Sequence, residues 1–328
     1  MPATKAPTLV YFQLAAGMII FGSATPVSRL VAEAMPVFLG AGLRVAIGGL
    51  ALAPFVRDWS AFGRLDRREW LLIAAIAVFG MFGFSVLLVL GMRMVTGVMG
   101  SVVMATTPAV TAAAAVVFLG ERLNLRKALS LALAVAGVLL LAVAGGGPAG
   151  DMPLRDADPV SAFVASLPSS TLLGMALVFG AVVSEAFYSL MGRQMSQETD
   201  PILVAFLAAI LSLPLFLPFA LIQTASFDAG ETHATDWIAV VWYGAGTLGL
   251  GTWLWFTGIS KAPASVAAAF MGLMPVSALV LSYGLLGEAF RWVHVAGFGI
   301  VFAGVLLMSV EHASHRAADD EEDAPQSA

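Results

Sequence analysis

The sequence predicts an all-α integral membrane protein with ten transmembrane helices, arranged as two inverted five-helix repeats. Three observations support this fold class. The chain is 59% hydrophobic and 11% charged, with a mean hydropathy of +0.92, whereas a soluble domain carries about 25% charged residues. The apolar residues form long runs, each near the ~20 residues that a spanning helix requires. One of these runs occurs twice.

The repeated run consists of an apolar helix with a central proline, a Gly-Glu stop, a short polar turn and a second apolar helix. A shift of 167 positions (275 minus 108) places Pro108 on Pro275. The same shift places Glu121 on Glu288 and Met104 on Met271, and no gap is needed between these pairs. A gapless series of matches indicates an internal duplication.

The apolar segments divide the chain into domains. We assign residues 1–148 to the first repeat, 149–169 to a linker rich in Gly, Pro, Ser and Asp, and 170–311 to the second repeat. Residues 312–328 form an acidic C-terminal tail that we expect to be disordered. The first segment is expected to be an uncleaved membrane helix. The segments are Leu9–Val31, Val37–Val56, Trp70–Gly91, Gly97–Phe118, Lys127–Ala144, Thr171–Met191, Ile202–Ile222, Trp237–Gly258, Ala264–Leu286 and Trp292–Val310.

Basic residues indicate the orientation. With a cytoplasmic N-terminus, most Lys and Arg residues lie in inside loops, and the outside loops hold only Arg93, Arg155 and Arg291, with Arg29 near the outer end of the first segment. The positive-inside rule therefore predicts that both termini are cytoplasmic. Five segments per repeat is an odd number, so the two repeats must be inverted. Inverted repeats are typical of transporters, whose substrate site lies between the repeats near the midplane. We expect a multi-pass protein of the bacterial cytoplasmic membrane.

The composition also limits the chemistry. The chain has no cysteine, which excludes disulfides, thiol catalysis and Cys-type metal sites. Its four histidines lie in loops or at segment ends without metal-ligand spacing, so we expect no metal and no cofactor. The net charge of −5 comes partly from the acidic run at 319–323, and no basic cluster suggests nucleic acid as a partner. No Walker motif is present to couple ATP.

Several motifs resemble a known family. The ten-segment pattern, the paired Pro…Gly-Glu runs, the early Phe21-Gly22-Ser23 and the Leu43-Arg44 of the second segment are similar to the drug/metabolite transporter superfamily. The resemblance is narrower to its branch with two EamA-type repeats, which includes the YddG-like amino-acid exporters. It implies export of amino acids, other metabolites or drugs. This chain has Phe21-Gly22 where many relatives have Trp-Gly, and Arg44 has no basic partner in the seventh segment.

Glu185 is the clearest anomaly in the apolar segments. It lies two-thirds along the sixth segment, with Tyr188 one turn later on the same face. A carboxylate at that depth is costly, about 3 kcal/mol on insertion scales, so it should face a wet cavity, pair with another group or be protonated. It is therefore a candidate proton carrier or substrate-binding group. The alternative is a structural salt bridge, or a position nearer the membrane surface. Arg44 is a similar case, which we interpret as structural.

The fourth and ninth segments carry matching faces. On the fourth segment, Met104 and Thr107 share a face with small residues, and Met271 and Met274 occupy the corresponding face of the ninth segment. Methionine provides an adaptable wall for ligands of different shape, although ordinary core packing would give the same pattern. The complete set of candidate substrate-binding residues is Thr25, Met81, Ser85, Met104, Thr107, Glu185, Tyr188, Thr252, Met271 and Met274.

Pro108 and Pro275 each remove a backbone hydrogen bond in mid-helix, which favours a kink. Their mirrored positions suggest hinges for alternating access, although proline is tolerated in membrane helices for structural reasons alone. Glu121 and Glu288 close their helices, and we interpret both as boundary residues.

The leading hypothesis is a secondary transporter that exports amino acids or similar small metabolites. Broad drug efflux is the alternative within transport. A polytopic membrane enzyme would need clustered His, Asp, Glu or Cys at membrane depth, so we do not expect an enzyme. A membrane sensor is disfavoured because the sequence shows no soluble output domain after the tenth segment. The expected partners are a small-molecule substrate and the lipid bilayer. Protons stay open as a coupling ion, but one carboxylate is a sparse relay, so we favour a facilitator.

Overall fold

The computed structural model describes residues 8–121, 123–144, 171–195 and 199–322. The described residues form helices and their connections, with no β-strand among them. Among the described residues, eight helices are long and apolar enough to cross a membrane, and Trp292–Leu307 is a shorter apolar helix. The chain is therefore an all-helical multi-pass membrane protein. The predicted linker (149–169) lies outside the described residues.

The described residues of the first half form seven α-helices and three other helical segments. They are α1 (Thr8–Ala34), α2 (Val37–Leu52), η1 (Ala53–Phe55), η2 (Trp59–Arg64), α3 (Arg67–Ala75), η3 (Ile76–Gly83), α4 (Phe84–Met92), α5 (Gly97–Met104), α6 (Thr107–Leu119) and α7 (Leu125–Ala144). A capping box fixes the start of α3, where Asp66 accepts from the backbone N–H of Glu69 and the Glu69 carboxylate accepts from that of Asp66.

The second half repeats this order. Its elements are α9 (Thr171–Arg193), α10 (Pro201–Ser226), η4 (Ala229–Glu231), α11 (Ala234–Val241), η5 (Trp242–Gly251), α12 (Thr252–Ile259), α13 (Ala264–Met271), α14 (Leu273–Leu286) and α15 (Trp292–Glu322). The starts of α3 and α11, of α5 and α13, and of α7 and α15 each differ by 167 residues (for example 264 minus 97). This is the spacing of the matching sequence pairs.

Two irregularities recur at the same spacing. The segments η3 and η5 are π-helical turns, and each joins two α-helices into one continuous rod. Between α5 and α6 the helix is interrupted at Ala105–Thr106, and between α13 and α14 it is interrupted at Gly272. Each interruption lies just before the central proline, as the missing proline N–H predicts. Both broken helices end in a left-handed glycine, Gly120 (φ 68°) and Gly287 (φ 62°), a conformation that glycine adopts without steric cost.

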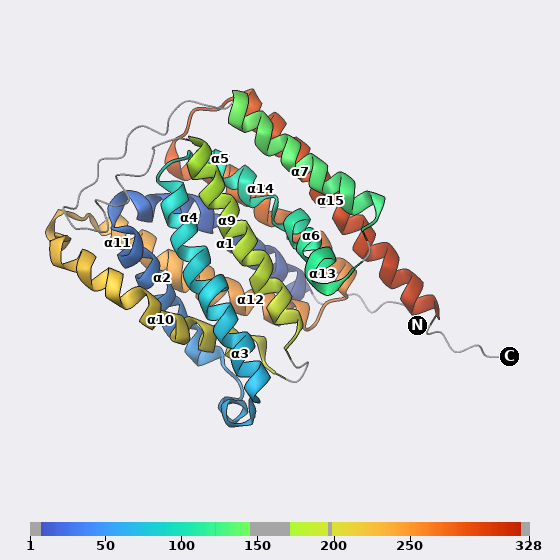
Figure 1. Ribbon diagram of the computed structural model, residues 1–328, viewed down its shortest axis with the longest axis horizontal. Coiled ribbons are helices and arrows are strands. Elements are labelled where there is room, and N and C mark those ends of the chain that lie inside the picture. Colours follow the sequence, from blue (N-terminus) through green and yellow to red (C-terminus); the bar gives the residue numbers. More distant parts are fainter. Residues whose placement is uncertain (1–7, 122, 145–170, 196–198, 323–328) are drawn as a thin grey trace.

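The helices pack in reciprocal pairs. The element α1 packs on α14, and α9 packs on α6; α2 packs on η5, and α10 packs on η3. Two further contacts join counterparts directly, namely α2 with α10 and α7 with α15, and α5 also packs on α14. Figure 1 shows α7 and α15 side by side along one edge of the molecule, outside the central group that contains α1, α4 and α9.

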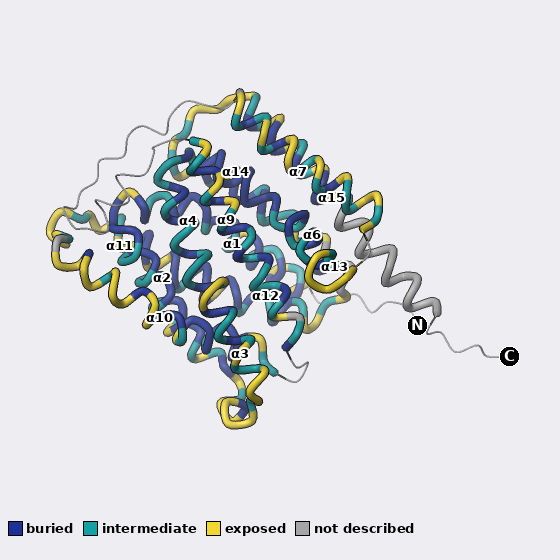
Figure 2. Tube along the Cα trace, viewed as in Figure 1, coloured by how far each residue is buried: buried dark blue, intermediate teal, exposed yellow. Residues whose placement is uncertain are grey.

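Residues in the centre of the molecule are more deeply buried than residues at its rim (Figure 2). The central helices are largely buried, whereas apolar residues at the rim are exposed, including Val143 at 86% and Leu125 at 74% on α7. Apolar side chains this exposed are expected to contact lipid.

Two segments differ from the sequence prediction. The eighth predicted segment, Trp237–Gly258, is helical from Ala234 to Ile259 but is not among the eight apolar spans, because its many Gly, Thr and Trp residues lower its hydropathy. Helix α15 continues to Glu322, whereas the predicted segment ends at Val310 and the predicted disordered tail begins at residue 312. No proline or glycine occurs between Gly304 and Pro325 to stop the helix.

Candidate functional site

Glu185 lies on α9 and is half-buried among the central helices. The hydroxyl of Thr107 donates to its Oε2 at 3.1 Å. Thr107 is the first residue of α6, directly after the interruption at Ala105–Thr106. The two side chains therefore join α9 to the broken helix at the point where that helix loses its regular hydrogen bonding.

The interruption has a compensating contact. Pro108 has no N–H to donate to the carbonyl of Met104 four residues earlier. The hydroxyl of Thr107 also lies 2.8 Å from this carbonyl oxygen and can donate to it instead. The Thr107 hydroxyl is thus within hydrogen-bonding distance of both the Met104 carbonyl at the interruption and the Glu185 carboxylate.

Arg44 on α2 lies in a second polar cluster. It is 7% exposed, and its Nη1 donates to Ser85 Oγ at 2.5 Å. Its guanidinium carbon lies 4.6 Å from the ring centre of Tyr243 and 5.3 Å from that of Phe84. Cations are attracted to aromatic faces at these distances. Phe84 and Ser85 directly follow one π-helical turn, and Tyr243 lies in the other.

The two clusters are adjacent. A Cβ on Gly83 would lie 3.3 Å from Ser184 Oγ, so the stretch of α9 beside Glu185 packs against the helix that carries Ser85. Among the described residues Arg44 forms no ion pair. Its Nε is buried without a hydrogen-bond partner. The structure therefore places a carboxylate and an incompletely satisfied guanidinium in the centre of the helices.

The remaining sequence candidates are distributed unevenly. Thr25, Met81, Met104 and Thr252 are buried at 3%, 3%, 4% and 5% exposure, and Met274 is partly buried. Thr25 lies beside α5, where a Cβ on Gly100 would approach its Cγ2 to 3.5 Å, and Tyr188 packs against Gly80 of η3. Met271, in contrast, is 47% exposed. Among the described residues, Thr107 with Glu185 is the only hydrogen bond between the side chains of two candidates, and Thr107 also bonds the backbone carbonyl of Met104.

Sequence reasoning missed the aromatic partners of Arg44. Arg44 was visible as a charge in an apolar segment, but Phe84 and Tyr243 lie on other helices, and no spacing rule connects them. The two π-helical turns, η3 and η5, bring these residues together, and no periodic pattern in the sequence predicts either turn.

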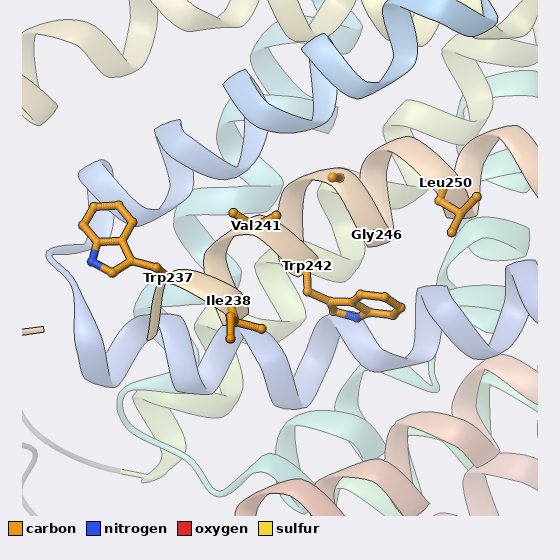
Figure 3. A pocket seen from close by; sticks show the side chains of 7 residues that line it. Trp237, Ile238, Val241, Trp242, Gly246 and Leu250 are labelled. Carbon is orange, nitrogen blue, oxygen red and sulfur yellow. The ribbon is translucent and has the colours of Figure 1, made fainter. Parts of the chain in front are cut away.

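An open apolar groove runs along α11 and η5 on the outside of the molecule (Figure 3). None of the polar residues described above lines it, and its Trp242 donates from Nε1 to Ser23 Oγ of α1 at 2.9 Å. Ile238 is 68% exposed there, so this groove faces the surroundings and is separate from the Glu185 and Arg44 clusters. It is lined by Trp237, Ile238, Val241, Trp242, Ala245, Gly246 and Leu250.

Comparison with known proteins decides the family. The model of the EamA-like transporter family matches the chain twice, over residues 8–143 and 172–310. The chain belongs to this family. Among similar proteins, the uncharacterized transporter YetK of Bacillus subtilis is 30% identical over 302 residues, which cover 92% of this chain and 87% of YetK. Both EamA matches contain a broken helix and a π-helical turn.

Two further comparisons extend the likeness. A probable terminal-alkyne amino-acid exporter of Streptantibioticus cattleyicolor is 25% identical over 295 residues, 89% of this chain and 90% of that protein. A solved crystal structure with 18% identity superposes with a TM-score of 0.56 over 92% of this EamA chain and 96% of its own. That structural likeness supports the fold. The EamA membership and the apolar helices together make this protein a membrane transporter.

Proposed function

We propose that this EamA-family chain is a secondary transporter that exports amino acids or related small metabolites by alternating access between two inverted five-helix repeats. The observation that carries the proposal is the Glu185–Thr107 pair at the break of α5 and α6. A half-buried carboxylate in the centre of the helices can bind a substrate ammonium group, and intramembrane charges commonly mark transport pathways.

The reciprocal packing supports the inverted repeat. Exchange of the two halves turns the contact of α1 with α14 into that of α9 with α6, and the contact of α2 with η5 into that of α10 with η3. A pseudo-two-fold axis in the membrane plane requires such exchange. The proposed topology has ten spans, repeats at 1–148 and 170–311, and both termini in the cytoplasm of a bacterial cell.

The broken helices support alternating access. The element α5 packs on α14, whereas the mirror contact of α13 with α6 is not made to a comparable extent in the described part of the chain. Under the proposed orientation, the outer halves of the two broken helices are closed together and the inner halves are less closely packed. Pro108 and Pro275 lie at the interruptions and are the proposed hinges.

The substrate class rests on two supports. One relative carries the name of an amino-acid exporter, and Glu185 provides an acceptor for an ammonium group. In this proposal Glu185 and Thr107 contact the substrate, and Thr25, Met81, Ser85, Met104, Tyr188, Thr252, Met271 and Met274 line the path. We propose that the substrate gradient alone drives transport, since one carboxylate is a sparse proton relay.

Broad drug efflux is the second candidate, because Met271 and Met274 give the second broken helix an adaptable apolar face. Counterflow of labelled L-leucine into leucine-loaded proteoliposomes, compared with drug resistance of cells that express the protein, separates the two. Amino-acid counterflow without drug resistance is the expected result. Drug resistance without counterflow of any amino acid would overturn the proposal.

The coupling mode has its own experiment. Wild-type efflux is expected to be the same with and without an imposed pH gradient, and Glu185→Gln is expected to weaken substrate binding. A wild-type response to the pH gradient that disappears in Glu185→Gln would instead make Glu185 a proton carrier.

A further inference from the structure

The charge of Arg44 is only partly compensated. Arg44 as a whole is 7% exposed, so its side chain is largely removed from bulk water. A buried cation is costly unless it is paired and hydrogen-bonded. Here the neutral Ser85 hydroxyl accepts from one N–H, and two ring faces lie at 4.6 and 5.3 Å. Within the described residues, Nε has no hydrogen-bond partner. Neutral hydroxyl and aromatic groups offset part of the cost of this burial, but they supply no counter-charge.

The nearby acid does not complete the site. Glu185 lies beside the helix whose Ser85 bonds Arg44 but forms no ion pair with Arg44 within the described chain, and its Oε2 accepts from Thr107 at 3.1 Å. The centre of the protein therefore presents one cationic and one anionic group that are near but separate. A molecule with an anionic and a cationic end could satisfy both.

We propose that Arg44 binds the carboxylate of the transported substrate while Glu185 and Thr107 bind its ammonium group. The transporter then selects zwitterionic α-amino acids against amines, amides and simple carboxylic acids. This inference rests on the proposed function of amino-acid export. Arginine suits the role because its planar N–H fork matches a carboxylate. Ser85 and the rings of Phe84 and Tyr243 hold the guanidinium in place from α4 and η5.

The competing role for Arg44 is structural. In that case Arg44 only tethers α2 to α4 through Ser85, or balances the charge of Glu185 across the bundle. Its loss would then lower stability or total transport activity, but it would not change which substrate group is recognised. The two roles are distinguished by a ratio between substrates, which a general loss of activity leaves unchanged.

The test is competition in leucine counterflow. Proteoliposomes loaded with L-leucine take up labelled L-leucine, and three unlabelled compounds compete from outside. L-leucine has both charged groups, L-leucinamide lacks the carboxylate, and 4-methylpentanoate lacks the ammonium group. In wild type, leucinamide and 4-methylpentanoate are each expected to compete at least about tenfold more weakly than leucine, because a site built to bind a charged group rejects an analogue without it.

Two variants test the carboxylate contact and the ammonium contact separately. Arg44→Gln is expected to bring leucine and leucinamide within about twofold of each other while leucine still exceeds 4-methylpentanoate, because only the carboxylate contact is lost. Glu185→Gln, the matched control, is expected to do the reverse: it keeps the preference for leucine over leucinamide and loses the preference over 4-methylpentanoate.

The outcomes are distinct. Equal competition by leucine and leucinamide in wild type overturns the assignment of Arg44 whether or not any variant folds. An unchanged leucine-to-leucinamide ratio in folded Arg44→Gln overturns it as well. No counterflow with leucine or any other amino acid would overturn the proposed function itself, whereas counterflow without a carboxylate preference leaves that function standing and removes Arg44 from substrate binding.

Discussion

The N-termini of α5 and α13 occupy equivalent positions in the two halves but have different partners. The carboxylate of Glu288 accepts from the backbone N–H groups of Gly97 and Val98, and the Thr96 hydroxyl accepts from that of Met99 at 3.2 Å. The first three N–H groups of α5 are therefore satisfied by side chains, and the negative charge of Glu288 is favourable at a helix N-terminus.

The second N-terminus lacks this arrangement. Helix α13 follows Pro263, and no side chain in the described part of the chain caps it. Glu121, the counterpart of Glu288, pairs with Lys127 at 2.8 Å. Glu288 thus joins two helices of different repeats, whereas Glu121 pairs with Lys127 of its own repeat. Two sequences that match across a duplication therefore hold different contacts in this structure.

The largest expected effect comes from Gly97→Val. A Cβ at Gly97 would lie 2.2 Å from Leu286 Cδ1 and 3.1 Å from Glu288 Oε1, so the variant should force the fastened end apart. Overpacking of this kind costs about 1–3 kcal/mol. Thermal unfolding in detergent measures the loss. Gly284→Val is the matched control, because a Cβ at Gly284 meets nothing within 4 Å. Equal destabilisation by both variants would contradict close packing at Gly97.

The cap itself is tested by Glu288→Ala. Loss of the carboxylate leaves two backbone N–H groups of α5 without acceptors, at an expected cost of about 1–2 kcal/mol. The same unfolding measurement applies. Glu288→Gln, which keeps one acceptor oxygen but no charge, should fall between wild type and the alanine variant. A larger loss for the glutamine variant would argue against capping.

Met104 and Met271 occupy equivalent positions in the two halves, and their reactivity tests whether the two broken helices have different surroundings. Because the chain has no cysteine, single cysteines at positions 104 and 271 can be labelled without background. Met271 is 47% exposed and Met104 is 4% exposed, so Met271→Cys is expected to react with a maleimide about tenfold faster, since only an exposed thiolate reacts readily. Labelling of unfolded protein corrects for intrinsic reactivity. Equal rates in the folded protein would mean that the two broken helices have equivalent surroundings.

The smallest effect is expected for Glu121→Ala. Its ion pair with Lys127 joins a carboxylate that is 39% exposed, and pairs of this kind contribute about 0–1 kcal/mol. Unfolding should therefore change by less than half of the loss in Glu288→Ala. Similar losses in the two alanine variants would remove the difference between the two turns.

The sequence predicted most helix positions because apolar runs and proline breaks depend on local physics. The starts of α5, α13 and α15 agree with the predicted segments, and both interruptions lie beside Pro108 and Pro275. The different roles of Glu121 and Glu288 could not be predicted, since both residues stand in the same local sequence. Likewise, Glu185 was visible as a charge in an apolar segment, but its bond to Thr107 depends on how α9 crosses the broken helix.

The hydrogen bonds of Thr107 connect the Glu185 carboxylate to the backbone of the broken helix. Its hydroxyl has one hydrogen but lies within bonding distance of two acceptors, the Met104 carbonyl at 2.8 Å and Glu185 at 3.1 Å. It can donate fully to only one of them at a time. An ammonium group on Glu185 would supply that carboxylate with another donor and leave the Thr107 hydrogen to the carbonyl that Pro108 cannot serve. If a substrate ammonium group binds Glu185 as proposed, its binding would strengthen the hydrogen bond from Thr107 to the Met104 carbonyl and so stiffen the broken helix.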